Sequence, residues 1–401
     1  MGAVSPYGRG VGILLDSLIA GKSGIRPAEE LAEIRGLRCR VAGLVPHIDH
    51  RAIPRKHRRS MSNMSIFAVL ACSEALQQAG LGTEECARGQ MGVAIGSTTG
   101  SIQATQEFFK NFLNTGSLEQ MKSTVFFKIM NHSCAANISK VLGLTGRILS
   151  PSAACSTSGQ ALGYGYEMIA FGRQQYMLCG GADEFHALTA GAFDVLNAAS
   201  VKFNDQPHRT PRPFDRDRDG VVCSEGSGII LLESLDSAQK RGVPILGEII
   251  GFSTVSDPKS IANPDADSIE FCMREALKDA GVEPQQIDYI NAHATATVQG
   301  DLAESAAIYK VFGNNTPVSS FKGHMGHTLA ASGALELCVL VGMLERQCLI
   351  PTLNLDNVDE ACKNIRHVKL LKTEKLQTAI KNNFALGGVN SSLVIRRYQN
   401  D

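Results

Sequence analysis

The sequence lacks several features that would assign the protein to a functional class at once. Its 401 residues include no tryptophan, and 39 lysines and arginines balance 39 aspartates and glutamates. A chain without net charge has no overall field that would attract nucleic acid or an anionic membrane surface. No stretch reaches the roughly 18 consecutive apolar residues of a membrane span, and the N-terminus shows no secretory signal pattern. We therefore expect a soluble, cytoplasmic protein with no nucleic-acid or membrane partner.

The common motifs for metals and nucleotides are also missing. The 11 cysteines stand singly, without a CxxC pair, and their odd number argues against a disulfide scaffold or a zinc knuckle. No glycine-rich stretch after a predicted strand has the GxGxxG or Walker spacing. We therefore predict no metal and no resident cofactor.

The segments that are present favour an α/β fold. Hydrophobic residues make up 44% of the chain, and helix-like and strand-like segments alternate along it. Residues 64–80 have helical spacing with a stop at Gly80, and Met91–Ile95 is typical of a buried strand. Residues 1–8 instead resemble a loop before a helix at 12–20, so we expect this half to open without its first strand.

Two segments of the chain recur in the same order about 200 residues later. Residues 74–81 resemble 275–282, and the Ser-Gly to Arg-Gln segment at 158–174 resembles 332–347. A period this long indicates an internal duplication rather than a solenoid. Turn residues near position 243 separate two apolar strands there. The predicted domains are residues 1–243 and 244–401.

Cys155 is the strongest candidate for a nucleophile. It lies between a predicted strand at 147–150 and a predicted helix, among the small residues Ala153, Ala154 and Ser156. Unpaired backbone N–H groups and the positive end of the helix dipole both favour a thiolate at such a position. A small buried structural cysteine is the alternative interpretation.

Two histidine segments follow predicted strands in the second half. His293 ends a strand, and strand C-termini are where open α/β sheets bind ligands. His324 and His327 have HxxH spacing, but no third ligand lies at an associated spacing, which argues against a metal. Lys322 is either a surface charge or a contact for an anion.

A glycine turn, Phe384-Ala-Leu-Gly-Gly, precedes a predicted strand at 393–395. It is typical of a hairpin, although its backbone N–H groups could form half of an oxyanion hole. One cysteine and two histidines at separate strand ends form a recognisable reaction set. The thiolate accepts an acyl group from a thioester, and two neutral imidazoles then donate hydrogen bonds to a second thioester carbonyl as it becomes an enolate.

On these motifs, the sequence resembles the type I/II β-ketoacyl-[acyl-carrier-protein] synthases, elongating condensing enzymes of the thiolase superfamily. The resemblance covers nearly the whole chain and rests on four ordered motifs: the segment around Cys155, PFDRDRDG at 213–220, HATATVQGD at 293–301, and Lys-x4-His at 322–327.

This resemblance implies a thiolase-type α/β fold, with two pseudo-symmetric halves in five αβαβα layers, and a homodimer. It also implies fatty acid elongation with substrates carried on the phosphopantetheine of acyl carrier protein. The implied roles are acyl attachment for Cys155; decarboxylation and condensation for His293 and His327; electrostatic support for Lys322 and Glu304; the oxyanion hole for the N–H groups of Cys155 and Leu386; and pantetheine or acyl-pocket contacts for Thr295, Thr297, Phe384 and Leu386.

Three positions depart from the pattern that the resemblance implies. Ala294 and Ala385 stand where the family commonly has glycine, and Leu386 stands where it has a phenylalanine that gates the acyl pocket. We therefore expect altered chain selectivity. A specialised-pathway ketosynthase that makes polyene or polyketide-type chains, with or without a partner subunit, is the alternative. A non-catalytic partner subunit is a further alternative, and acylation of Cys155 distinguishes it.

A short basic cluster stands out on the otherwise neutral chain. It falls where the resemblance implies a helix that docks an acidic acyl carrier protein, whereas a solvated surface or weak nucleic-acid patch is the alternative. The members of the cluster are Arg55, Lys56, Arg58 and Arg59.

Overall fold

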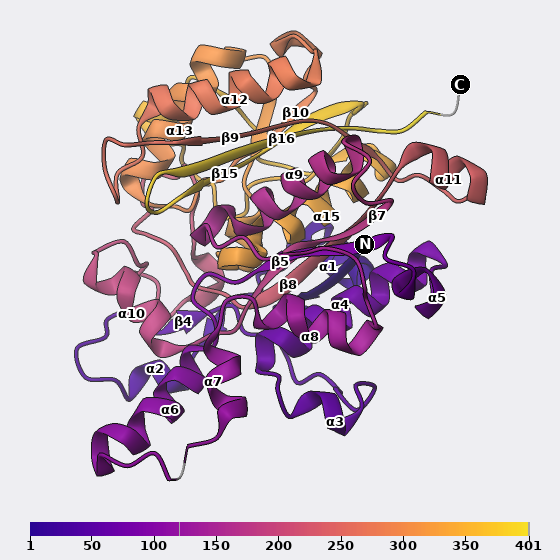
Figure 1. The fold of residues 1–401 in the computed structure, drawn as a ribbon. Coiled ribbons are helices and arrows are strands. Elements are labelled where there is room, and N and C mark those ends of the chain that lie inside the picture. The colour runs from indigo at the N-terminus through magenta and orange to yellow at the C-terminus, as the bar shows by residue number, and fades with distance from the viewer. Residues whose placement is uncertain (120, 400–401) are drawn as a thin grey trace.

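Two six-stranded sheets dominate the computed structural model, which describes residues 1–119 and 121–399 (Figure 1). The first sheet has the order β2-β1-β8-β7-β5-β6 and the second β13-β11-β10-β15-β16-β9. The first contains β1 (Gly2–Ser5), β2 (Gly8–Arg9), β5 (Met91–Gly96), β6 (Ile148–Leu149), β7 (Tyr176–Asp183) and β8 (Gly226–Glu233). The second contains β9 (Glu248–Ser256), β10 (Tyr289–Asn291), β11 (Pro317–Ser319), β13 (Arg366–His367), β15 (Thr378–Ala385) and β16 (Val389–Arg396).

Helices fill the space between the sheets and cover their outer faces (Figure 1). The outer helices α4 (Asn63–Ala79) and α8 (Ser133–Leu142) pack on the first sheet. Helix α12 (Ala266–Ala280) packs on the second sheet and contacts α13 (Val298–Phe312) beside it. The inner helices are α9 (Thr157–Ala170) and α15 (Ser332–Arg346). The five predicted αβαβα layers are therefore confirmed. The duplicated segments occupy equivalent layers, while the boundary at residue 243 stays a prediction.

Local sequence explains where the outer helices end. The C-caps Gly80 of α4 and Gly281 of α12 have φ of 62° and 63°, in the left-handed region that only glycine adopts without cost. The predicted helix at 64–80 and the predicted strand at 91–95 are thus both confirmed.

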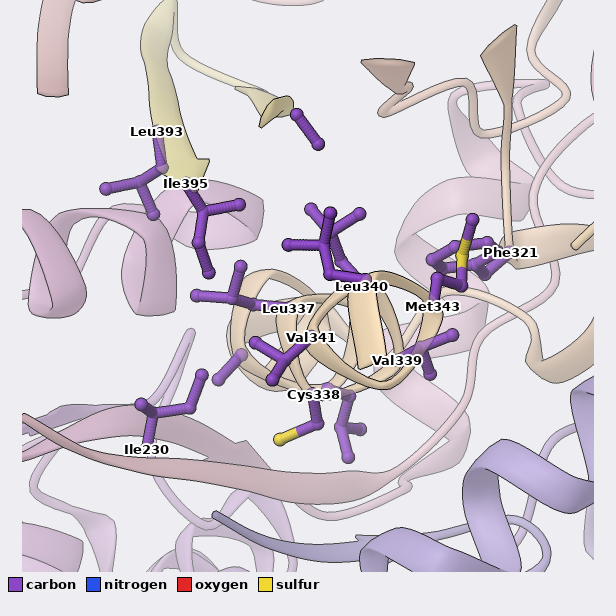
Figure 2. Close-up of a cluster of buried hydrophobic side chains, with 14 of the residues drawn as sticks. Ile230, Phe321, Leu337, Cys338, Val339, Leu340, Val341, Met343, Leu393 and Ile395 are labelled. Atoms are coloured by element: carbon purple, nitrogen blue, oxygen red, sulfur yellow. The ribbon is translucent and has the colours of Figure 1, made fainter. Parts of the chain in front are cut away.

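Helix α15 lies in the centre of the molecule and is apolar on almost every side. All its residues from Ser332 to Leu344 are buried, which is typical of a helix enclosed by two sheets. Figure 2 shows Leu337 and Val341 of this helix between Ile230 of β8 on one side and Leu393 and Ile395 of β16 on the other. The core that joins the two halves is built around this helix.

The prediction that residues 1–8 open the chain without a strand was wrong. Gly2–Ser5 form β1, which pairs antiparallel with β8 in the register Gly2↔Ile229 and Val4↔Ser227. The segment was hard to recognise because it is short and begins with glycine. That glycine has a packing reason, since a Cβ at Gly2 would lie 1.9 Å from the carbonyl oxygen of Ala71 in α4.

Shorter elements complete the described chain: α1 (Val11–Ile19), β3 (Arg26–Pro27), α2 (Glu29–Ala32), β4 (Val41–Ala42), α3 (Arg55–Arg58), α5 (Thr83–Ala87), α6 (Ile102–Thr115), α7 (Ser123–Ile129), α10 (Ala187–Val195), α11 (Leu235–Arg241), α14 (Lys322–Met325), β12 (Cys348–Leu349) and β14 (Lys372–Thr373). No helix in the part of the chain that the structure describes has the length and apolar character needed to cross a bilayer.

Candidate active site

Cys155 lies in a 3-10 turn, η1 (Ala154–Ser156), that leads directly into α9. Ala154 has φ of 45°, a left-handed conformation that costs a residue with a side chain about 1 kcal/mol or more. The hydroxyl of Ser156 donates to the carbonyl oxygens of Asn383 and Val389, at 3.0 and 2.7 Å, and so ties the turn to the second half. The strained turn is thus held in place from the opposite sheet.

The environment of the Cys155 sulfur combines opposing effects on its pKa. Burial raises the pKa of the Cys155 thiol to about 11, whereas Lys322 and the backbone N–H groups of Leu386 and Cys155 lower it. The prediction that this position favours the thiolate was therefore wrong in net direction, because desolvation outweighs the helix terminus. The two N–H groups are nevertheless those predicted for the oxyanion hole.

His327 contacts the sulfur directly. Its Nε2 lies 2.8 Å from Sγ of Cys155, and its Nδ1 accepts a hydrogen bond from the backbone N–H of Leu329 at 3.3 Å. A nitrogen that accepts a hydrogen bond carries no proton, so the geometry assigns the proton to Nε2. Burial, followed by Lys322, holds the pKa of His327 well below its usual range.

His293 completes a buried triad of side chains. Its ring lies 5.4 Å from that of His327 in an edge-to-face arrangement, and the ligand atoms of Cys155, His293 and His327 all lie within 4.8 Å of one another. Burial is the main cause that holds the pKa of His293 well below its usual range. Both imidazoles are therefore neutral, as the proposed reaction set requires.

Glu304 fixes the backbone beside His293 rather than its ring. The carboxylate accepts the N–H groups of His293 and Ala294 at 2.8 and 2.6 Å. Burial raises the pKa of Glu304 to about 7, although these two N–H groups lower it. Its placement supports the predicted association with the site, through the position of the histidine loop.

Lys322 is fully buried, which excludes the interpretation of a surface charge. Its Nζ lies 2.6 Å from Oε1 of Glu336 on α15, and Oε2 of the same carboxylate lies 2.7 Å from Nζ of Lys381 on β15. All three side chains have no exposed surface. Sequence reasoning missed Glu336 and Lys381, although Glu336 is the one charge in the buried part of α15 and Lys381 the one charge in β15.

A cavity of about 280 Å³ leads from the surface to Cys155, His293 and His327. At its mouth Thr295 and Thr297 have their hydroxyl oxygens 3.0 Å apart, Phe384 is buried, and Leu386 is 43% exposed. The structure thus brings the predicted pantetheine and acyl-pocket residues around one opening. Cys155, His293 and His327 lie at its buried inner end, whereas Lys322 does not line it.

The family assignment follows from comparison with known proteins. Residues 1–238 match the family model "Beta-ketoacyl synthase, N-terminal domain", and residues 246–356 match "Beta-ketoacyl synthase, C-terminal domain". The chain belongs to the beta-ketoacyl synthase family. It is 34% identical over 399 residues to 3-oxoacyl-[acyl-carrier-protein] synthase 1 of Haemophilus influenzae, covering 99% of this chain and 97% of the relative. A synthase 2 of Vibrio cholerae is 35% identical over 407 residues, with the same coverage of both chains.

Solved structures of beta-ketoacyl synthases have the same fold. A synthase from Burkholderia phymatum superimposes with a TM-score of 0.96 at 40% identity, covering 99% of this chain and 98% of that one. A structure described as the ishigamide ketosynthase/chain length factor has a TM-score of 0.92 at 29% identity and the same coverage. The predicted thiolase-type fold is therefore confirmed.

Among the described residues, His324 of the HxxH spacing is not part of the group of possible metal ligands that contains His327 in this beta-ketoacyl synthase. His324 is buried away from the triad, and its ring nitrogens have no partner among the described residues. A thiolate and two imidazoles such as Cys155, His293 and His327 could hold a soft divalent ion such as Zn²⁺. The absence of a metal from the working enzyme therefore stays a prediction.

The basic cluster lies on α3, outside the residues that line the cavity. Arg55, Lys56 and Arg59 are exposed, whereas Nε of the half-buried Arg58 donates to the carbonyl oxygen of Ile53 at 2.9 Å. Three of the four predicted docking residues are thus free to meet a partner. The fourth stabilises its own loop.

Proposed function

We propose that the protein is an elongating β-ketoacyl-[acyl-carrier-protein] synthase of fatty acid biosynthesis. It transfers an acyl group from acyl carrier protein to Cys155, and then condenses that group with malonyl carrier protein to give β-ketoacyl carrier protein and CO2. The observation that carries the proposal is the 2.8 Å contact between Sγ of Cys155 and Nε2 of a neutral His327, with His293 beside it at the end of the cavity.

The first half-reaction is an exchange of thioesters. Because Nε2 of His327 carries a proton, it donates to the sulfur and stabilises negative charge there. Attack by the Cys155 sulfur on the acyl carbonyl places an oxyanion near the N–H groups of Cys155 and Leu386. When the intermediate collapses, the bond to the pantetheine sulfur breaks, and over the half-reaction the cysteine proton passes to that sulfur.

The second half-reaction uses the two imidazoles as hydrogen-bond donors. They bind the thioester carbonyl of the malonyl group, and loss of CO2 leaves an electron pair that forms the enolate. The enolate carbon then attacks the acyl-Cys155 thioester, and the cysteine sulfur leaves. Each step uses thiol, imidazole and thioester groups alone, so we propose that no cofactor is needed beyond the phosphopantetheine of the carrier.

Intact mass spectrometry tests this function. Wild type and Cys155→Ala are incubated with acyl carrier proteins that bear saturated, unsaturated or polyunsaturated chains, and CO2 release from malonyl carrier protein is followed separately. We expect acylation of wild type alone, with ordinary saturated chains preferred. Acylation of Cys155→Ala, or none of wild type, would contradict the proposal.

A specialised-pathway ketosynthase is the second candidate. It is favoured by Leu386 at the cavity mouth and by the similarity to the ishigamide ketosynthase/chain length factor. In the same mass experiment, preference for conjugated or unusual chains would support this candidate over primary fatty acid synthesis.

The proposed partner is an acidic acyl carrier protein that meets the exposed cations of α3. Reversal of charge at Lys56 and Arg59 should raise KM for carrier-bound substrates by about tenfold and leave small pantetheine thioesters unaffected. Equal losses with both kinds of substrate would show that α3 does not dock the carrier.

We also propose a homodimer in the cytoplasm. Strand β6 is one of the two edge strands of the first sheet, and its Ile148 is 48% exposed. An exposed edge strand presents unpaired backbone groups that a second copy can pair with. Light scattering should give twice the chain mass for wild type and a smaller mass for Ile148→Lys; a monomeric wild type would refute the dimer.

A further inference from the structure

Three buried charged side chains form a cluster near His293 and His327. The cluster contains two cations and one anion. Glu336 contacts both Lys322 and Lys381, and Ser332 also donates to its Oε1 at 3.1 Å. Among the residues that the structure describes, neither ammonium has a second carboxylate within 4.0 Å. Two cations on one anion leave a surplus positive charge among fully buried side chains, where charge acts over a longer range than at the surface.

Lys381 is also connected to the nucleophile turn. It lies on β15 opposite Asn291 of β10, two residues before His293. Its Nζ donates to Oδ1 of Asn383 at 3.1 Å, and the carbonyl oxygen of Asn383 accepts the hydroxyl of Ser156, next to Cys155. The ammonium group is thus held in a fixed place between the glutamate and the turn.

Protonation of either imidazole would disrupt the arrangement described above. An imidazolium at His327 could no longer accept the N–H of Leu329 at Nδ1. At His293, Nδ1 is buried without a partner among the described residues, so a proton there would leave an unpaired donor. The site requires neutral rings, and a nearby positive charge favours that form.

We propose that Lys381 is a positioning residue for the condensation site: by sharing Glu336 with Lys322, it leaves a positive charge that keeps His293 and His327 neutral and donating. This inference rests on the proposed function and adds a residue to it. Lys381 does not line the cavity that reaches the sulfur, so it would act through the two rings. Other charged groups that act on it are Glu336 on α15, Lys322 on α14 and Glu304 on α13.

The electrostatic directions agree with this arrangement. Lys381 lowers the pKa of both His293 and His327, in addition to the larger effect of burial. Burial in turn lowers the pKa of Lys381 to about 8, against the attraction of Glu336. The charge on Lys381 is therefore largely present at neutral pH, fully present at acidic pH, and lost as the pH rises through about 8.

The test compares Lys381→Met with wild type, since methionine keeps the length of the chain and removes its charge. CO2 release from malonyl carrier protein is measured from about pH 5.5 to 9. The acid limb of Lys381→Met should move up by about one pH unit, which gives about a tenfold lower rate on that limb. The two profiles should converge above about pH 8, where wild type has lost the same charge.

Two further variants separate charge from structure. Lys310→Met removes a half-exposed lysine that pairs with Asp267, and its profile should overlay that of wild type. Lys381→Arg keeps the charge and should keep the wild-type acid limb even if its rate is lower. An unshifted limb in Lys381→Met, or an equal shift in Lys381→Arg, would overturn the proposal.

Spectra of ¹⁵N-labelled histidine provide a readout that does not depend on turnover, because they report the charge and tautomer of each ring. In Lys381→Met, His293 and His327 should gain imidazolium character at a pH where wild type shows neutral rings only. If wild type neither accepts an acyl group nor releases CO2, the proposed function is wrong. If wild type is active but the spectra of Lys381→Met are unchanged, only the proposed role of Lys381 is wrong.

Discussion

The two inner helices begin in the same way and do different chemistry. Helix α9 follows the 3-10 turn η1, in which Ala154 has φ of 45°, and α15 follows η4 (Leu329–Ala331), in which Leu329 has φ of 52°. The second residue of the turn is Cys155 in the first half and Ala330 in the second. The duplicated fold thus contains the same turn before both inner helices, and only the turn of the first half carries a nucleophile.

The surroundings of the two turns differ as much as the residues themselves. The N–H of Ala330 donates to the buried carboxylate of Asp183 at 2.8 Å, which closes the second turn to ligands. The N–H of Cys155 instead faces its own sulfur beside the cavity. Conversely, α15 carries the buried Glu336, whereas α9 presents no charge to the site. One half offers the reacting atom, and the other offers the groups that control its electrostatics.

The largest expected effect comes from removing the charge on α15. Glu336→Gln leaves two buried ammonium groups without a counter-ion, because the amide is neutral and its NH2 group cannot accept from the lysine that it faces. Breaking a buried ion pair on one side costs about 3–5 kcal/mol of unfolding free energy. Thermal and urea unfolding measure the loss, and Glu345→Gln, at an exposed position of the same helix, is the matched control.

A loss no larger in Glu336→Gln than in the control would show that the two lysines find other partners or lose their protons. In that case the surplus charge assigned to the site would not exist. The contrast between α15, which carries a buried charge, and α9, which carries none, would then have no electrostatic consequence.

Sequence reasoning found the helices that recur but aligned them one residue out of register. The Ser-Gly match pairs Ser158 with Ser332, whereas the helix starts place Thr157 opposite Ser332. The glycines dominate the sequence match because the helices cross there: a Cβ at Gly333 would lie 2.9 Å from the backbone nitrogen of Gly159. The glycines that give the sequence match are explained by close helix packing. They do not occupy equivalent positions in the two helices.

The residues that carry sulfur and imidazole could be predicted because each lies in a segment of small residues that follows a strand. Glu336 and Lys381 could not, since their roles depend on contacts between α14, α15 and β15 that no local pattern encodes. The net pKa of Cys155 was missed for a similar reason. Burial is a property of the whole fold, whereas the helix terminus is visible in the sequence.

A smaller effect is expected from the packing of the two inner helices. In α9, a Cβ at Gly163 would lie 2.2 Å from the ring of Phe252, which packs against Tyr164. In α15, a Cβ at Gly342 would lie 2.5 Å from a terminal methyl of Leu15, which can rotate. Gly163→Ala should therefore cost about 1–3 kcal/mol. Gly342→Ala should cost less, because alanine favours the helix by up to about 1 kcal/mol.

Urea unfolding of the two variants checks this difference, with each serving as the control for the other. Equal losses would mean that the aromatic contact of α9 yields as easily as the aliphatic contact of α15. Both helices would then accommodate an added methyl group equally well, although the contacts with Phe252 and Leu15 predict a difference.

The smallest expected effect concerns the loop between β15 and β16. This loop lines the cavity beside η1, the turn that carries Cys155, and among the described residues it has no counterpart in that cavity beside η4. Leu386 lies at the cavity mouth in the hairpin between β15 and β16, and its backbone N–H faces Cys155. A phenylalanine there is larger and stiffer, while the N–H is unchanged. Leu386→Phe should therefore leave acylation by the preferred chain within about twofold and change the ratio between long and short chains by about threefold to tenfold.

Competition between acyl carrier proteins of different chain length measures that ratio, with Leu235→Phe on the exposed surface of α11 as the control. The expected change appears in selectivity and not in the rate for one chain, because the side chain narrows the entrance without touching the sulfur. An unchanged ratio would mean that Leu386 contributes only its backbone to the site. The loop would then serve the first turn only by forming the oxyanion hole. Residues deeper in the cavity would determine which chain length is preferred.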